Sequence, residues 1–92
     1  MSDHYNQYRQ LGIAIKYYRN LRNMSQADLA EKINKSRTYI SKIEAPNVRI
    51  GLRLDTLFDI ADALEVTPDQ LLQYPHDHQK EITDSDSSQL QL

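Results

Sequence analysis

The segment from residue 25 to residue 46 reads SQADLAEKINKSRTYISKIEAP and predicts two short helices joined by a tight turn. Ser25 can cap the first helix, because Asp28 follows three residues later at the spacing of a capping box. Asn34, a residue that tolerates the left-handed conformation, ends this helix. Ser36 can then cap the next one. The turn between the two helices is therefore about three residues long.

The second of these helices carries different chemistry on its two sides. Ile40 and Ile43 share one face, and Ala45-Pro46 ends the helix. At about 100° per residue, the other side presents a mixed set of hydrogen-bonding side chains. They are Arg37, Thr38, Ser41 and Lys42. Arginine and lysine can donate to guanine, and serine and threonine can bond to bases or phosphates, so the face favours contact with the DNA major groove. A face that is merely solvated is the alternative that the pattern alone leaves open.

Three further helical patterns surround this pair. The first runs from near residue 5 or 8 to residue 22 and is closed by Asn23, and the fourth covers residues 54–64. Thr67-Pro68-Asp69-Gln70 then predicts the start of a short fifth helix. The apolar residues that mark the two longer patterns are Leu11, Ile15, Tyr18, Leu54, Leu57, Ile60, Ala61 and Leu64.

The predicted fold class is therefore all-α, a compact bundle of five short helices within one domain over residues 1–74. The remainder, residues 75–92, is polar, acidic and rich in serine and glutamine, and it lacks a helical period. This composition predicts a disordered tail.

Charge is distributed unevenly along the 92 residues, although the formal net charge is only -2. Residues 1–53 hold ten Lys/Arg and four Asp/Glu, for a net charge of +6, whereas residues 54–92 hold one lysine and nine acids, for -8. Such an asymmetry suits a protein of which one face meets phosphates. Chance clustering of solvated charges is the alternative interpretation.

Size and composition narrow the class of protein. No run of 18 apolar residues and no cysteine occurs, so the sequence predicts neither a membrane span nor disulfide bonds, and we expect a cytoplasmic protein. A domain this small is only marginally stable alone. We therefore expect a homodimer, joined through the fifth helix with Leu71, Leu72 and Tyr74.

Taken together, several motifs resemble the Cro and phage-repressor-like (XRE) helix-turn-helix family. The resemblance covers about residues 9–73 and rests on the motifs that follow. They are Leu11-Gly12 with Ile15 and Arg19, Ser25-Gln26-Ala27-Asp28-Leu29-Ala30, Ser36 to Glu44, and Leu57 with Ile60-Ala61-Asp62-Ala63-Leu64-Glu65-Val66. The resemblance implies a lambda-repressor-like DNA-binding fold.

The resemblance also implies roles for individual residues. Arg37, Thr38, Ser41 and Lys42 match positions that face base edges or adjacent phosphates. Arg19 and Glu44 match an ion pair that links the first and third helices, and Gln26 matches a residue that grips a phosphate and braces the third helix. The full set assigned to phosphate contact is Ser25, Gln26, Tyr39, Asn47, Arg49 and Arg53.

The chain also departs from the family pattern. Glycine is common in the family at the positions of Asn23, Asn34, Pro46 and Glu65, and an apolar residue at that of Lys35. The two asparagines preserve left-handed geometry, so both turns are still expected.

The function that the sequence predicts is a transcription regulator, a repressor, that binds a palindromic operator in double-stranded DNA as a homodimer. The alternative is an antitoxin or protein-interaction module on the same fold, with a protein partner bound by the acidic tail. No enzyme is expected. His76 and His78 flank Asp77 but lack the further ligands of a rigid metal site, so we expect no metal and no cofactor. Four tyrosines of the first helix are expected to pack in the core or at a dimer edge, namely Tyr5, Tyr8, Tyr17 and Tyr18.

Overall fold

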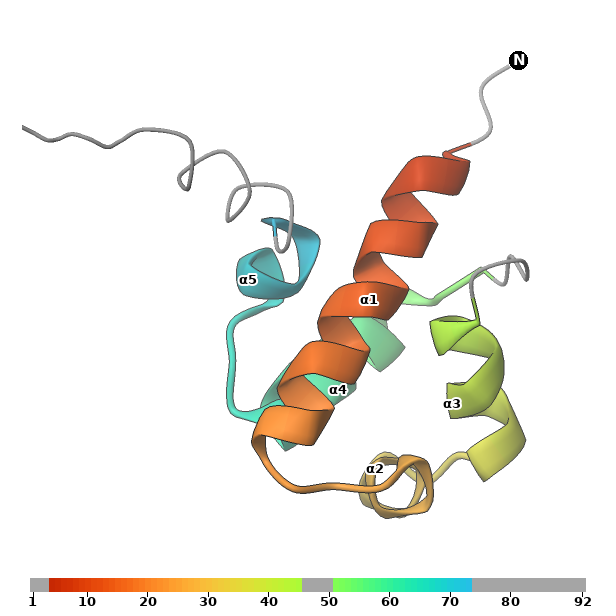
Figure 1. Ribbon diagram of the computed structural model, residues 1–92, viewed down its shortest axis with the longest axis vertical. Helices are drawn as coiled ribbons and strands as arrows, with labels where there is room; N and C mark the ends of the chain where they lie inside the picture. Colours follow the sequence, from red (N-terminus) through yellow and green to blue (C-terminus); the bar gives the residue numbers. More distant parts are fainter. Residues whose placement is uncertain (1–3, 46–50, 74–92) are drawn as a thin grey trace, which may run out of the picture.

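Five helices form the described part of the chain, which comprises residues 4–45 and 51–73 of a computed structural model. They are α1 (Tyr5–Leu21), α2 (Gln26–Lys32), α3 (Arg37–Glu44), α4 (Leu54–Leu64) and α5 (Pro68–Gln73), and these two ranges contain no strand. α1 runs through the middle of the molecule, with α3 on one side, α5 on the other and α4 behind it (Figure 1). The predicted all-α fold with a helix-turn-helix is confirmed.

One hydrophobic core joins all five helices. Its largest fully buried side chains are Ile15, Leu29, Ile40, Ile60, Leu64 and Leu71. Burial of a leucine or isoleucine side chain contributes roughly 1.5–3 kcal/mol, so each helix is held mainly by its apolar face. The expectation that Leu71 takes part in a dimer contact is wrong, because this side chain is fully buried within its own chain and fixes α5 against the core.

Three helices end with the same arrangement of backbone hydrogen bonds, each around a residue with positive φ. Asn23, Asn34 and Glu65 have φ values of 60°, 61° and 62°. After α2, for example, the Lys35 N–H donates to the Ala30 carbonyl at 2.8 Å, which satisfies a terminal carbonyl of the helix. The asparagines preserve the turns as expected, and Glu65 adopts the same conformation despite its side chain.

Side-chain caps begin α2 and α3 as predicted. The Ser25 hydroxyl accepts from the Asp28 N–H at 2.9 Å, and the Asp28 carboxylate accepts from the Ser25 N–H at 2.9 Å, which completes a capping box. The Ser36 hydroxyl accepts from the Tyr39 N–H at 3.1 Å. Before α5, which begins at Pro68 as predicted, the Thr67 hydroxyl donates to the Gln70 side-chain oxygen at 3.0 Å. The Thr67 N–H donates to the same oxygen at 2.8 Å.

α1 and α3 approach each other closely at Gly12. A Cβ atom at this position would collide with the backbone carbonyl oxygen of Ile43 and would lie 3.3 Å from the Glu44 Cα. Glycine within a helix costs about 1 kcal/mol relative to alanine. The absence of a side chain here is what lets α1 pack directly against the last turn of α3.

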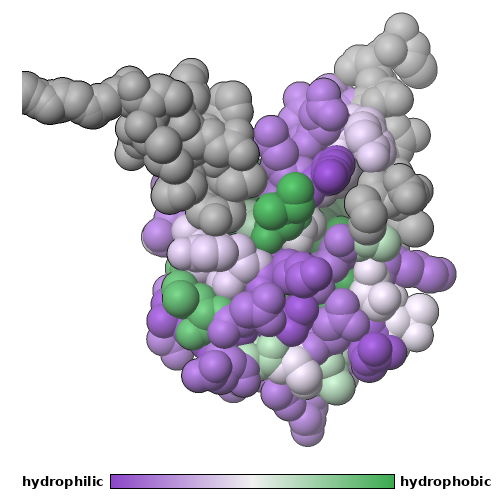
Figure 2. Space-filling model, viewed as in Figure 1, coloured by the Kyte–Doolittle hydropathy of each residue, from purple (hydrophilic) through white to green (hydrophobic). Residues whose placement is uncertain are grey.

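The face of the molecule seen in Figure 2 is mostly hydrophilic, with hydrophobic areas limited to small patches. Of the predicted packing tyrosines, Tyr18 packs against the core and Tyr8 is half-buried, whereas Tyr5 and Tyr17 are exposed. None of the helices in the described ranges has the length and apolar character to cross a membrane.

Candidate DNA-binding surface

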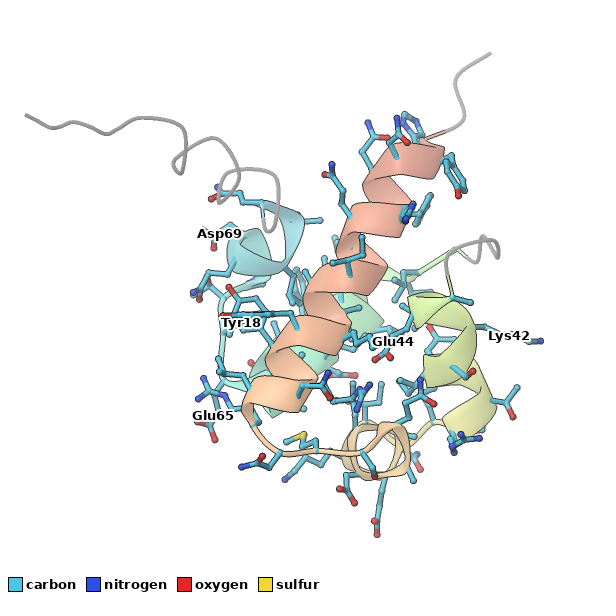
Figure 3. The ribbon with its side chains drawn as sticks, in the orientation of Figure 1. Tyr18, Lys42, Glu44, Glu65 and Asp69 are labelled. Carbon is cyan, nitrogen blue, oxygen red and sulfur yellow. The ribbon has the colours of Figure 1, made fainter. Side chains whose placement is uncertain are left out.

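α3 has one face in the core and one in solvent. Ile40 and Ile43 are buried, whereas Arg37, Thr38 and Lys42 are exposed. Lys42 points away from the rest of the molecule (Figure 3). The fourth residue of the predicted base-contacting set, Ser41, is half-buried, as is Tyr39 from the predicted phosphate-contacting set. The helix therefore offers a basic and polar ridge supported from below by two isoleucines.

A buried hydrogen-bond network fixes the C-terminal end of α3. Glu44 accepts from Arg19 Nε at 2.8 Å through Oε2 and from Arg19 Nη2 at 3.0 Å through Oε1. The exposed fractions of the two side chains are only 8% for Arg19 and 3% for Glu44. A two-point arginine–carboxylate contact fixes orientation as well as distance. The ion pair that the resemblance implies is present, and Glu44 lies between α1 and α3 (Figure 3).

The same network reaches the start of α2. Gln26 donates its side-chain N–H to Glu44 Oε1 at 3.0 Å, and Arg19 Nη1 donates to the Met24 carbonyl at 2.7 Å. Glu44 is thus the common acceptor for α1 and α2. Of the two roles implied for Gln26, bracing of the third helix is a contact seen in this fold, and its amide retains a second N–H and an oxygen for another partner.

The capping box brings Ser25 and Gln26 to the exposed N-terminal end of α2. Hydrogen bonds from the Ser25 backbone and hydroxyl groups lower the pKa of the Asp28 carboxyl below its usual value of 3.8, so the carboxylate stays charged in neutral solution. The charge also suits the N-terminal end of a helix.

Two contacts near α3 and α4 were missed by sequence reasoning. The Lys35 ammonium lies 5.4 Å from the centre of the Tyr39 ring, and these residues are four apart, a spacing that could have suggested the pair. Arg22 donates through Nε to the Leu64 carbonyl at 2.8 Å and through Nη2 to the Glu65 carbonyl at 3.1 Å. Since these partners are more than 40 positions away, no local pattern could have revealed them.

Only one of the remaining three residues predicted to contact phosphates lies within the described part of the chain. Arg53 is exposed and immediately precedes α4. Asn47 and Arg49 lie outside the described residues, as do Tyr74 and the predicted tail over residues 75–92 with His76 and His78.

A surface pocket of about 490 Å³ lies between the end of α2 and the acidic side of α4. Its lining residues are Lys32, Ile33, Asn34, Asp59, Asp62 and Ala63. Within residues 4–45 and 51–73, no group of three or more His, Cys, Asp or Glu is positioned to hold a metal ion.

Comparison with known proteins agrees with this geometry. A family model described as helix-turn-helix matches residues 15–71. The structure of a hypothetical transcription factor NHTF from Neisseria is 29% identical, with a TM-score of 0.76, and the match covers 89% of this chain and 90% of that one. The restriction-modification controller protein C.AhdI from Aeromonas hydrophila is 26% identical, with a TM-score of 0.68 and coverage of 76% and 99%.

A further similar structure contains nucleic acid. SinR, a master regulator for biofilm formation, was solved in complex with DNA, and it is 32% identical to this chain over 67% of this sequence and 97% of its own, with a TM-score of 0.62. No curated protein sequence matches this chain.

Proposed function

Because this chain belongs to the XRE-type helix-turn-helix family of DNA-binding transcription regulators, we propose that it is a repressor that reads the DNA major groove with α3 as a homodimer. The observation that supports this most directly is the exposed face of α3. Arg37, Thr38 and Lys42 project from a helix whose opposite face is anchored in the core. The family and the fold are typical of regulators rather than of enzymes.

The contacts with DNA divide into two sets under this proposal. Arg37, Thr38, Ser41 and Lys42 contact base edges, where donor and acceptor patterns differ between base pairs. Ser41 is the most buried of the four, so its contact depends on close approach of the helix to the groove.

The second set holds the protein in place on the phosphates. It comprises Ser25, Gln26, Tyr39, Asn47, Arg49 and Arg53. Ser25 and Gln26 stand at the N-terminal end of α2, where backbone N–H groups favour an anion. Gln26 couples the two sets, because it also donates to Glu44 at the end of α3.

Selection of bound sequences from random duplex DNA tests the proposal. We expect enrichment of a palindromic operator whose half-sites lie about 10 to 10.5 base pairs apart, since two copies of α3 in a dimer enter successive major grooves. The same sequence as duplex RNA should not compete, because the A-form major groove does not admit a helix. Absence of any enriched sequence would contradict a sequence-specific DNA-binding role.

A further inference from the structure

The turn between α2 and α3 holds a lysine against an aromatic ring. The Lys35 ammonium lies 5.4 Å from the centre of the Tyr39 ring, which is within the range of a cation–π contact. Lys35 is exposed, whereas Tyr39 is half-buried and packs against the hydrophobic core. The ring is therefore a fixed surface on which the flexible lysine side chain is placed.

Hydrogen bonds hold the backbone at both residues. The Lys35 N–H donates to the Ala30 carbonyl at 2.8 Å, and the Tyr39 N–H donates to the Ser36 hydroxyl at 3.1 Å. The mobility that remains to Lys35 is thus that of its side chain, and the contact with the ring restricts it. Because ordering of a long side chain opposes binding, a lysine that is ordered in advance binds an anion more tightly.

The polar groups of the two side chains have no other partner among the described residues. The one ion pair within residues 4–45 and 51–73 joins Arg19 to Glu44, so Lys35 forms none there, and the Tyr39 hydroxyl makes no hydrogen bond with this part of the chain. An ammonium offers three N–H donors and a phenol one O–H donor. Since the hydroxyl is carried by the ring against which the ammonium lies, one phosphate group can contact both.

The position of this pair suits the edge of a DNA contact. Lys35 comes two residues before Arg37, with which α3 begins, and the turn that carries it lies at an outer corner of the molecule (Figure 1). Phosphates border the groove that a reading helix enters, so residues beside the start of that helix meet the DNA backbone. Resting on the proposed function, we propose that Lys35 and Tyr39 form one phosphate-binding subsite, in which the ring holds the ammonium in place. Lys35 thereby joins the set of phosphate contacts as a cation.

Titration of the full chain with its selected duplex at several salt concentrations tests the charge. Lys35→Met retains an unbranched side chain and is expected to weaken binding by about fivefold near 0.1 M salt and to reduce the log-log salt slope by about one unit. The loss should be the same on a scrambled duplex, because a phosphate contact carries no sequence information. Lys35→Arg keeps the charge and the contact with the ring, so it should retain the slope.

A neighbouring lysine provides the matched control. Lys32 is also exposed and lies three positions earlier, but it lines the pocket beside α4 instead of contacting the Tyr39 ring. Lys32→Met removes the same charge and should leave the salt slope unchanged. If Lys32→Met and Lys35→Met reduce the slope equally, the effect belongs to the net charge of the protein and the subsite is refuted.

A double-mutant cycle tests the part played by the ring. Tyr39→Leu removes the ring, whereas Tyr39→Phe removes the hydroxyl and retains the surface under the ammonium. We expect the loss of affinity caused by Lys35→Met to be at least about twofold smaller in the Tyr39→Leu background than in the wild type, as an exposed cation–π contact implies. In the Tyr39→Phe background that loss should persist. Equal losses in the wild type and the Tyr39→Leu background would overturn the joint subsite.

The outcomes separate this inference from the proposed function. Circular dichroism verifies that each variant is folded, and the Lys35 variants change only an exposed position. Unchanged affinity and salt slope for Lys35→Met, beside a loss of operator preference for Arg37→Ala, would reject the subsite and retain the sequence-specific role. A wild type that enriches no sequence yet binds duplex DNA with a slope that Lys35→Met reduces would do the reverse.

Discussion

Glu44, the last residue of α3, accepts two hydrogen bonds from Arg19 of α1, 25 positions earlier in the chain, and both side chains are almost completely buried. The contact sets the position of α3 relative to the rest of the bundle. Because the charges have little access to water, each depends on the other for its solvation.

Replacement of one partner should therefore lower the free energy of unfolding more than replacement of both. We expect Arg19→Met or Glu44→Leu alone to lower the free energy of unfolding by about 3–5 kcal/mol, since a buried charge is left without a partner, and the double variant to be more stable than either. Urea denaturation of the four proteins in a double-mutant cycle measures this. Small and additive losses would show that the pair contributes little to stability.

A methyl group at Gly12 should separate α1 from α3. Gly12→Ala is expected to lower the free energy of unfolding by about 1–3 kcal/mol, because the new Cβ collides with the Ile43 backbone, which cannot rotate away. Lys16→Ala, at an exposed position of the same helix, is the control and should have little effect. If Gly12→Ala is more stable than the wild type, as is common for this change in an open helix, the close approach is refuted.

Replacement of Glu65 should relieve backbone strain. Glu65→Gly is expected to raise the free energy of unfolding by about 1 kcal/mol, because φ is 62° at this position and glycine adopts that conformation without a steric penalty. Glu65→Ala removes the same charge and retains a Cβ, so it should not give this gain. Equal stability of the two variants in thermal unfolding would assign the effect to charge.

Acid should weaken the capping box of α2. The pKa of the Asp28 carboxyl is lower in the folded chain than its usual value of 3.8, so its contribution to stability is fully present above that value. This contribution is lost as the pH falls through the lowered pKa, because both states are then protonated. The stability difference between wild type and Asp28→Asn should accordingly be constant from pH 7 to about 5 and should shrink below pH 4. If urea denaturation shows that the stability difference between the two proteins stays unchanged down to pH 2, the charged Asp28 carboxylate is not what stabilises the capping box.

Arg37 and Gln26 should behave differently on DNA. Arg37→Ala is expected to cost about 1–3 kcal/mol on the selected operator and less on a scrambled duplex, since a base contact carries sequence information. Gln26→Ala should weaken binding to both duplexes alike, because a contact with a phosphate carries no sequence information. Lys16→Ala again provides a control away from α3. Titrations of each variant on both duplexes measure the ratio of the two dissociation constants. Equal losses of affinity for Arg37→Ala on the two duplexes would exclude Arg37 from the base-contacting set.

The helices could be predicted because their signals are local. Ser25 and Ser36 cap helices through residues three positions later, and the apolar period of each segment marks the side that is buried. The buried state of Leu71 could not be read in this way, since a helix of six residues has too few positions to separate a core face from a surface.

The contacts of the site were predictable to different degrees. The partnership of Arg19 with Glu44 followed from the family resemblance and not from spacing. The bonds from Arg22 to the end of α4 depend on how two distant helix ends meet, which no single segment encodes. Lys35 was treated as a departure from the pattern, whereas its side chain lies over Tyr39.

The division of α3 into a buried and an exposed face has a consequence for how such a protein changes over generations. Substitutions at Arg37, Thr38 or Lys42 touch no part of the core, and surface substitutions of this kind usually alter stability by less than about 0.5 kcal/mol. Under the proposed function, the fold and the preference for a particular DNA sequence are therefore inherited almost independently. A duplicated copy of the gene could acquire a new operator through a few changes on one ridge while it retained every contact that holds the helix in place.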